Sequence, residues 1–428
     1  MPAGDVLSQF GWLAGAKLVQ GVSSLVATLA IARALGPAEY GSLSLAIAVA
    51  TFVTVLAALG LEQVATRELV SRVDAPARTL HLLTRLRWGG AIGGSCLLLG
   101  LAFVPQVREL QSGTLLLVLA LLPLAQVGDL AEWRLIASAQ GRRVAIVTAS
   151  VSPVAALLRC ALALAGFGAL AFAWMLVVEW TVRSLLLSWL AGHPLRTADP
   201  RPAGTQWRQA AALLRESMPL LLSGLAVFAY MRIDTFMIAG MLGRHDVGLY
   251  SAIVALAELP LVLPMLLLRA SLPVLTRVGA EDPVRRDREL MKLMGMGFYL
   301  HAGVACVLAF AAEPLLALLY GEAFRPAAAA LQIQLLCAPF VALGVLSSAW
   351  LVLERKTGHA LRRTLVGAVV NIGLNLVLIP AAGIVGAALA TLVAQLLATY
   401  IADAFHRETR DLFMLKTRAF WPPNWERT

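Results

Sequence analysis

The sequence predicts an all-α protein that crosses a membrane many times, and three observations carry this prediction. Of its 428 residues, 59% are hydrophobic and only 14% are Asp, Glu, Lys or Arg, whereas about 25% of the residues in a soluble domain are charged. Twelve stretches are long and apolar enough to span a bilayer, which takes about 20 residues of helix. A segment near the start also recurs near the middle. The composition excludes a soluble enzyme, a disordered chain and a disulfide scaffold.

The twelve predicted spans follow one another with short connections, so no soluble domain fits between them. Residues 1–10 contain no Lys or Arg, and we therefore expect no cleavable signal peptide. The predicted spans are 12–31, 40–60, 88–104, 114–136, 144–166, 169–191, 217–241, 247–268, 294–312, 327–353, 364–381 and 384–405.

The distribution of basic residues predicts the topology. The chain has 35 Lys and Arg against 25 Asp and Glu, an excess that in a soluble protein would suggest a nucleic-acid partner. In a membrane protein the same excess is typical of cytoplasmic loops. If both termini are cytoplasmic, the inner loops and the tail hold 27 of the cations, the outer loops hold four and the spans hold four. We therefore expect two cytoplasmic termini and no nucleic-acid partner.

An internal repeat predicts two halves. IARALGPAEYGSLS (31–44) matches IAGMLGRHDVGLYS (238–251) at a constant offset of 207 positions, and the shared glycines suit a tight corner between helices. Leu-Gly turns are common in membrane proteins, so a chance match is the alternative. The predicted division is an N-terminal six-helix lobe (1–191), a cytoplasmic linker (192–216) and a C-terminal six-helix lobe with a short cytoplasmic tail (217–428).

Several motifs resemble one transporter family. ARALGPAEYGSLSLA and LGLEQVATREL in the first half, MRIDTFMIAGMLG in the middle, and LYGEAF and NIGLNLVLIPAAGIVGAALAT in the second half occur in this order. Together they resemble the polysaccharide transporter family (Wzx-type O-antigen flippases) of the multidrug/oligosaccharidyl-lipid/polysaccharide exporter superfamily. The resemblance extends over nearly the whole chain.

The resemblance implies a fold and a function. The two lobes would form a V-shaped central cavity. The protein would move an oligosaccharide repeat unit linked to undecaprenyl diphosphate across the bacterial inner membrane by alternating access, during lipopolysaccharide or exopolysaccharide synthesis. It would use a coupling proton or Na⁺ and no other cofactor. Its partners would be the lipid-linked substrate, the bilayer, a polysaccharide polymerase and other glycan assembly proteins.

Charged residues inside the spans are the candidates for substrate binding. A charge at mid-bilayer costs about 2.5–3.5 kcal/mol, so such groups should line a watery cavity or be paired. Guanidinium groups bind phosphates through two parallel hydrogen bonds, which favours an anionic lipid-linked sugar over a cationic drug. Two asparagines four residues apart could bind sugar hydroxyls, although Asn more often joins helices in a bilayer. The predicted substrate-binding residues are Lys17, Arg159, Arg183, Arg232, Asn371 and Asn375.

Three acidic residues are candidates for ion coupling, namely Glu179, Asp234 and Glu258. Each has a structural alternative. Glu179 and Arg183 could form an ion pair within one helix. Arg232 and Asp234 lie about 200° apart on a helix, so both cannot face one cavity. Glu258 precedes Pro260, which could mark a packing kink.

Other charges in or near the spans have simpler interpretations. Lys17 could extend to the cytoplasmic surface. Asp129 and Glu132, close to Arg134, are interpreted as an interfacial cluster.

No motif indicates an enzyme or a metal site. The chain has no Walker A, HExxH or G-x-S-x-G sequence. Its four cysteines form no CxxC or Cys/His spacing, so we expect neither zinc nor disulfides. Three alternative functions stay open: a cation-coupled multidrug exporter, which the arginines disfavour, a lipid-linked peptidoglycan-precursor flippase, which would need two further helices, and a non-transporting scaffold of a glycan assembly complex.

Overall fold

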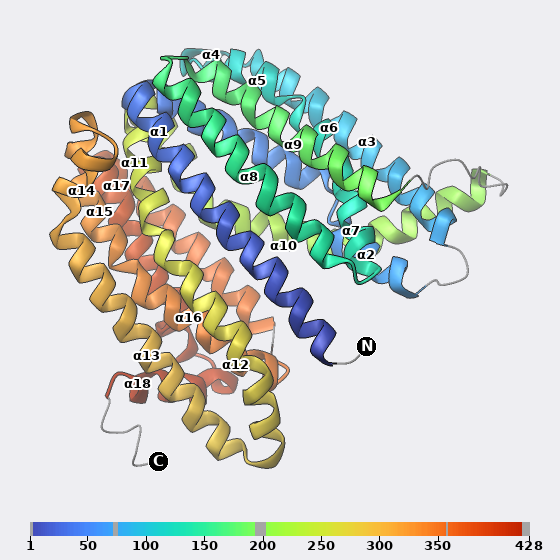
Figure 1. The fold of residues 1–428 in the computed structure, drawn as a ribbon. Coiled ribbons are helices and arrows are strands. Elements are labelled where there is room, and N and C mark those ends of the chain that lie inside the picture. The colour runs from blue at the N-terminus through green and yellow to red at the C-terminus, as the bar shows by residue number, and fades with distance from the viewer. Residues whose placement is uncertain (1–2, 72–75, 193–202, 357, 422–428) are drawn as a thin grey trace. The chain divides into compact units, whose positions relative to one another are not determined.

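The computed structural model describes residues 3–71, 76–192, 203–356 and 358–421, and every regular element in these ranges is a helix. The chain forms two compact units, residues 1–225 and residues 226–428. Figure 1 shows the path of the helices. The prediction of an all-α, multi-pass membrane protein is confirmed.

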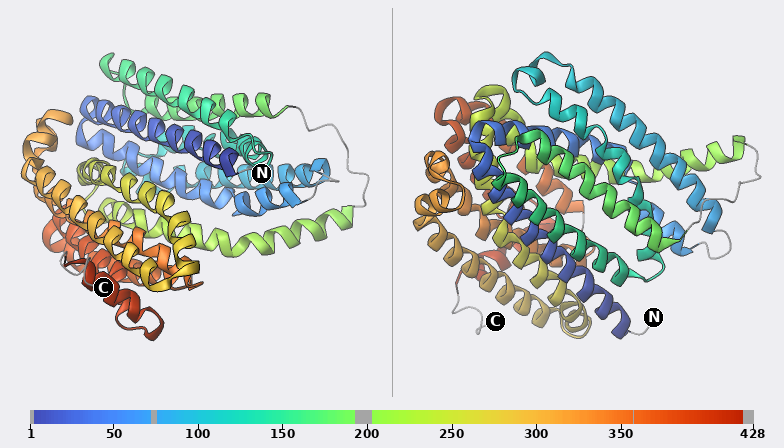
Figure 2. Two further views of the ribbon diagram at one scale, coloured as in Figure 1. Left: turned by 60° about the horizontal axis from the view of Figure 1, so that its bottom comes forward. Right: turned by 45° about the horizontal axis from the view of Figure 1, so that its top comes forward.

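Unit 1 is built around the long first helix. Helices α8 and α9 pack along α1, and α3 and α5 also contact it. Figures 1 and 2 show α8 beside α1 in every view. The elements are α1 (Ala3–Ala57), α2 (Leu61–Ser71), α3 (Pro76–Ala102), α4 (Pro105–Glu109), α5 (Gly113–Leu119), α6 (Leu122–Ala125), η1 (Gln126–Gly128), α7 (Asp129–Ala137), α8 (Gly141–Leu164), α9 (Ala169–Ala191) and the first part of α10 (Ala203–Met241).

Unit 2 packs around α13, α16 and α17, which contact most of the other helices of the unit. Its elements are the end of α10, then α11 (Arg244–Ala257), η2 (Leu259–Leu261), α12 (Val262–Glu281), α13 (Pro283–Phe310), α14 (Ala312–Leu319), η3 (Glu322–Ala327), α15 (Ala328–Leu335), α16 (Cys337–Leu353), α17 (Gly358–Thr399), η4 (Ile401–Asp403), η5 (Arg407–Thr409) and α18 (Arg410–Ala419).

Nine helical stretches within the described residues are long and apolar enough to cross a membrane. The stretch 11–57 contains one predicted span and most of the next, and the stretch 358–405 contains two. Gly36 (φ 68°) and Gly383 (φ 60°) interrupt the helical backbone at these places. The predicted span 88–104 falls in α3, which is not one of the nine. The stretches are therefore compatible with twelve crossings, but the count stays a prediction.

The two copies of the repeat form the same corner. Gly36 and Gly243, which are equivalent at the offset of 207, both have positive φ, at 68° and 94°. L-residues rarely adopt this conformation, so glycine is the natural residue at each corner. The sequence match therefore reflects a shared local structure.

The predicted linker differs from the observed chain. Residues 193–202 of the 192–216 segment lie outside the described residues. Residues 203–216 are not an irregular connection, because α10 begins at Ala203 and continues to Met241. The boundary between the units falls inside this helix, after Leu225. The division into two lobes of six helices stays a prediction.

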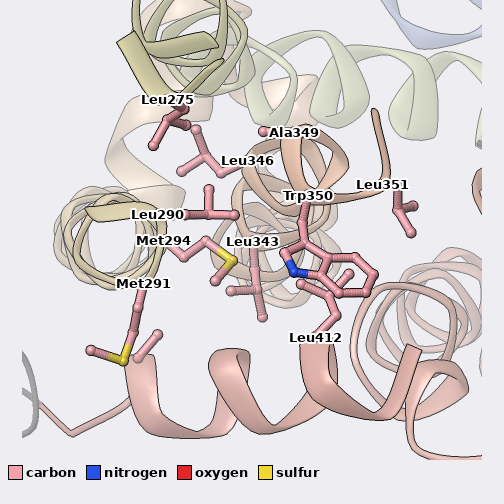
Figure 3. Close-up of a cluster of buried hydrophobic side chains, with 11 residues drawn as sticks. Leu275, Leu290, Met291, Met294, Leu343, Leu346, Ala349, Trp350, Leu351 and Leu412 are labelled. Atoms are coloured by element: carbon pink, nitrogen blue, oxygen red, sulfur yellow. The ribbon is translucent and has the colours of Figure 1, made fainter. Parts of the chain in front are cut away.

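A buried apolar cluster holds the last helix of the chain against unit 2. Leu290 and Met294 of α13, Leu343 and Leu346 of α16, and Leu412 of α18 are almost completely buried, as Figure 3 shows. Burying a leucine side chain contributes about 1.5–3 kcal/mol. This packing places α18 firmly against the bundle and brings its polar residues to defined positions.

Candidate functional site

Unit 1 contains a network of two buried arginines and two partly buried carboxylates. Arg87 of α3 is 1% exposed and donates to the carbonyls of Ala57 (2.9 Å) and Gln126 (3.1 Å). It also lies 3.5 Å from Asp129, whose other carboxylate oxygen lies 3.5 Å from Arg183 of α9. Asp129 is thus held by two cations from two different helices.

Arg183 completes this network with a second carboxylate. It donates to Glu132 of α7 and lies over the ring of Trp180 at 5.1 Å. The predicted alternative, an ion pair between Glu179 and Arg183 within one helix, is not what the structure shows. The predicted charge cluster around Arg134 also differs from the structure, because Asp129 contacts Arg87 and Arg183, and Glu132 contacts Arg183.

Glu179 pairs with Arg159 instead. The two residues belong to adjacent helices, α9 and α8, and their side chains are 14% and 11% exposed. Two of the four predicted substrate-binding cations, Arg159 and Arg183, are therefore neutralised by carboxylates of neighbouring helices. Lys17 is exposed and donates to Gln20 at 3.1 Å.

In unit 2, Arg232 and Asp234 point in different directions, as their spacing on the helix predicts. Arg232 lies 3.6 Å from Glu258, and both side chains are more than one third exposed. Asp234 is 6% exposed and turns into the bundle. Glu258 directly precedes η2, where Pro260 interrupts the α-helical pattern.

Asp234 is surrounded by neutral hydrogen-bond donors. Its Oδ2 accepts from the hydroxyls of Tyr250 (2.8 Å) and Thr391 (2.9 Å), and its Oδ1 accepts from Nδ2 of Asn375 (2.6 Å). Asn375 also donates to Asn371 (3.0 Å), which donates to Thr391 (3.3 Å). Within the described residues, no cationic side chain lies within ion-pair distance of Asp234, which differs from the buried carboxylates of unit 1.

The same cluster contains an oxygen without a partner. Oδ1 of Asn375 is buried and has no hydrogen-bond donor within the described residues. Oxygens of Asp234, Asn371 and Thr391 lie close together, because Nδ2 of Asn375 donates to the first two and Thr391 is hydrogen-bonded to both Asp234 and Asn371. A group of carboxylate, amide and hydroxyl oxygens is the kind of ligand set that hard cations prefer, and a carboxylate in this setting could also take up a proton.

This cluster forms one wall of a cavity of about 580 Å³ inside unit 2. The cavity is lined mainly by apolar side chains of α10, α11, α12, α16 and α17. Its polar wall includes Asp234, Tyr250, Asn371 and Thr391 and, separately, the two arginines Arg269 and Arg363. Neither arginine was among the predicted site residues, because both fall in segments assigned to inner loops.

Arg363 is part of a buried triad that reaches to the last helix. It donates to both carboxylate oxygens of Asp403, at 2.8 and 2.6 Å. Lys416 of α18 donates to Asp403 (2.8 Å) and to the carbonyl of Thr399 (2.5 Å). Lys416 is completely buried, and this burial, reinforced by Arg363, lowers its pKa to about 7. Two cationic groups thus share one carboxylate.

One sequence signal could have found Arg363. Arg363, Gly367, Asn371 and Asn375 recur every four residues and are all buried in α17. Residues at this spacing lie along one face of a helix. Tyr250 and Thr391 give no comparable signal, because each contributes a single hydroxyl from another helix.

Comparison with known proteins identifies related sequences. A sequence model described as "Polysaccharide biosynthesis protein" matches residues 6–278, and a MatE model matches residues 219–377. The succinoglycan biosynthesis transport protein ExoT of Rhizobium meliloti (strain 1021) is 28% identical over 330 residues. That match covers 75% of this chain but only 63% of ExoT, so the chain spans less than two thirds of the length of this relative.

Solved structures share the fold at low sequence identity. An inward-facing multidrug resistance MATE family transporter of the MOP superfamily has a TM-score of 0.72 at 14% identity, covering 93% of this chain and 96% of the transporter. The lipid II flippase MurJ in an inward closed conformation has a TM-score of 0.71 at 13% identity, covering 95% of this chain and 90% of MurJ. The likeness to these two structures shows the fold alone.

Proposed function

Because the chain belongs to the polysaccharide biosynthesis protein family, among the transporters of the MOP superfamily, we propose that it is a lipid-linked oligosaccharide flippase. Its substrate would be an oligosaccharide repeat unit on undecaprenyl diphosphate, moved across the bacterial inner membrane by alternating access and coupled to a cation. The observation that carries this proposal is the cavity of unit 2, whose wall combines arginines with a carboxylate that has no cationic partner among the residues that the structure describes.

The arginines of this cavity suit an anionic head group. Arg363 and Lys416 share the single negative charge of Asp403, so the triad carries one excess positive charge whenever Lys416 is protonated. A buried excess charge is costly unless an opposite charge approaches. Arg269 also lines the cavity. A diphosphate would supply the missing negative charge and could accept hydrogen bonds from guanidinium groups.

The three arginines that the sequence predicted have a different part in this proposal. Arg159, Arg183 and Arg232 each have a carboxylate partner, which must release them before they can bind a phosphate. Arg232 is the most exposed of the three, and its contact with Glu258 at 3.6 Å is the loosest. Arg363 has such a partner too, because both oxygens of Asp403 hold it. We assign the first contact with the diphosphate to Arg269 and Arg363 because both line the cavity, and later contacts to Arg232.

Asp234 is the residue that we assign to cation coupling. A buried carboxylate without a cationic partner is costly, and a proton or Na⁺ would remove this cost. The hydroxyl of Thr391 and the side-chain oxygen of Asn371, which accepts from the same Nδ2 of Asn375 as Asp234 does, are oxygen ligands that a bound Na⁺ could share. Glu258 and Glu179 are less suited to this role, because each already contacts an arginine.

The test is flipping of a labelled undecaprenyl-diphosphate oligosaccharide in vesicles with an imposed proton or Na⁺ gradient. We expect Asp234→Asn to reduce gradient-driven flipping by at least about tenfold, which corresponds to roughly 1.4 kcal/mol. Asp246→Asn, at the start of α11 and outside the cluster, serves as the matched control. Unchanged gradient dependence in Asp234→Asn would overturn the coupling role, and the absence of flipping by the unaltered protein would overturn the substrate.

A cation-coupled multidrug exporter is the second candidate, because the MatE model matches residues 219–377 and the cavity is mostly apolar. The same vesicles can be loaded with a lipophilic cationic dye. Gradient-driven movement of the dye, without flipping of the lipid-linked sugar, would favour this candidate over the flippase.

A further inference from the structure

Two imidazoles and a carboxylate come together where the end of the chain meets the start of α17. His359 is the second residue of α17. His406 directly precedes η5, and Glu408 lies within it. One ligand atom from each of the three side chains lies within 4.8 Å of the other two. We propose that these residues form a binding site for a divalent transition metal, of which Zn²⁺ is the representative ion. This site is separate from the transport cavity and does not depend on the proposed function.

The donors are already oriented toward one another. Nε2 of His359 lies 2.8 Å from Oε2 of Glu408. The rings of His359 and His406 lie edge to face, with centroids 4.6 Å apart. Nδ1 of His406 is shielded from solvent and has no hydrogen-bond partner within the described residues. A buried ring nitrogen without a partner is unusual and calls for an explanation, which a bound metal would supply after a change of tautomer.

The backbone that carries these donors is held firmly. Arg363 binds Asp403 through two hydrogen bonds, and Lys416 binds the same carboxylate. Thr409 is 1% exposed, and its hydroxyl donates to the carbonyls of Asp403 (3.0 Å) and His406 (3.3 Å). The segment 403–409 is therefore fixed relative to α17, so that little order has to be created when a metal binds.

The donor types select the class of metal. Two imidazole nitrogens and one carboxylate oxygen are a ligand set that Zn²⁺ uses with a water as fourth ligand. Ca²⁺ and Mg²⁺ prefer oxygen ligands throughout. Tetrahedral coordination needs ligand atoms roughly 3.3 Å apart, so modest side-chain rotations would close the observed group around an ion. Glu408 is 60% exposed, which leaves the fourth position open to water.

A neighbouring arginine competes with the metal. Nη1 of Arg362 lies 2.9 Å from Nε2 of His406, where it occupies the lone pair of the imidazole. Lys356 donates to the main-chain carbonyl of Glu408 at 2.9 Å and leaves the carboxylate available. A metal bound to Nδ1 would put the proton of the imidazole on Nε2, and Nε2 could then no longer accept a hydrogen bond from Arg362. Removing the Arg362 guanidinium should consequently strengthen metal binding, an effect that a purely structural role of the histidines would not produce.

No sequence motif predicts this site. Zinc motifs usually place two pairs of ligands within a few residues. Here only His406 and Glu408 are close in sequence, and His359 is 49 positions from Glu408. Bound metal would join the first turn of α17 to the segment that leads into α18. Metal availability would then control how firmly the last helix is attached.

The test uses the full chain, purified without a histidine tag, stripped with a chelator and titrated with Zn²⁺ by calorimetry and with Co²⁺ by absorption spectroscopy. We expect one equivalent of metal per chain and a tetrahedral Co²⁺ spectrum. His359→Gln and His406→Gln should each weaken binding by at least about tenfold, Glu408→Gln should weaken it less, and Arg362→Gln should strengthen it. His245→Gln, an exposed histidine beside an aspartate in α11, is the matched control.

The proposal would be overturned by any of three results. The first is no stoichiometric binding by the unaltered chain. The second is binding that His359→Gln and His406→Gln leave unchanged, which would indicate an adventitious ion only. The third is weaker binding in Arg362→Gln, because loss of a competing cation cannot weaken a metal site of this kind. Circular dichroism of each variant distinguishes loss of ligands from loss of the fold.

Discussion

The network around Arg183 in unit 1 and the cluster around Asp234 in unit 2 bury their carboxylates in different ways, although unit 2 also contains the paired triad of Arg363, Asp403 and Lys416. In unit 1, each of the two carboxylates near Arg183 contacts a guanidinium, and Asp129 contacts two. In unit 2, Asp234 is more deeply buried than either of them but accepts hydrogen bonds only from hydroxyl and amide groups within the described residues. A carboxylate paired with a guanidinium stays charged at little cost and holds two helices together. A carboxylate among neutral donors is stabilised strongly when it binds a proton or a small cation.

The internal repeat sharpens this comparison. At the offset of 207, the position equivalent to Asp234 in the first half is Ala27, which is 2% exposed. The two halves share the corner at Gly36 and Gly243 but not the acid on the helix that precedes it. The repeat therefore shares a corner between the two halves but does not carry over the acid of the polar cluster.

The largest expected effect concerns the network of unit 1. Arg183→Met leaves Asp129 and Glu132 without their shared cation, and breaking a buried pair from one side costs about 3–5 kcal/mol. Thermal unfolding in detergent measures this loss. The double variant Arg159→Met/Glu179→Met removes both members of a pair and should cost less than about 1 kcal/mol. Equal losses in the two variants would contradict the view that this network is a set of balanced pairs.

The second effect is a pH dependence in unit 2. The pKa of Lys416 is about 7 in the folded chain and 10.5 at its ordinary value. Between these pH values the unfolded chain binds more protons, so the free energy of unfolding rises with pH, by about 2 kcal/mol from pH 7 to pH 9. Below the folded pKa this group causes no further change.

Lys416→Met should remove this pH dependence, and Lys292→Met, on α13 and more exposed, should retain it. Unfolding curves collected at several pH values make the comparison. A slope that persists in Lys416→Met would show that another group causes it.

The smallest expected effect distinguishes Asp234 from Asp129 most directly. Asp234→Asn replaces an uncompensated buried carboxylate by a neutral amide of the same shape, so the free energy of unfolding should stay the same or rise by about 1 kcal/mol. Asp129→Asn should lower it, because Arg87 and Arg183 would lose a partner. If Asp234→Asn destabilised the fold as much as Asp129→Asn does, the distinction between the two units would fail.

The sequence identified single residues, whereas the structure added the partners that contact them. Asp234 and the asparagine pair Asn371 and Asn375 were identified one helix at a time, from a charge inside a span and from a spacing of four. Their direct contact with one another depends on the packing of α10 against α17 and could not be predicted from either helix alone. The partners of Arg159 and Arg183 were missed for the same reason, since they come from neighbouring helices.

The sequence by itself determined the membrane class, the order of the apolar helices and the glycine corners, because these features depend on local composition and backbone conformation. Only the tertiary structure decided which charges are paired, which carboxylate has neutral donors around it, and which side chains from distant segments meet at one place. The physical reason is that helix rotation and packing bring together groups that are more than a hundred positions apart, as Asp234 and Thr391 are, and no local pattern records these contacts.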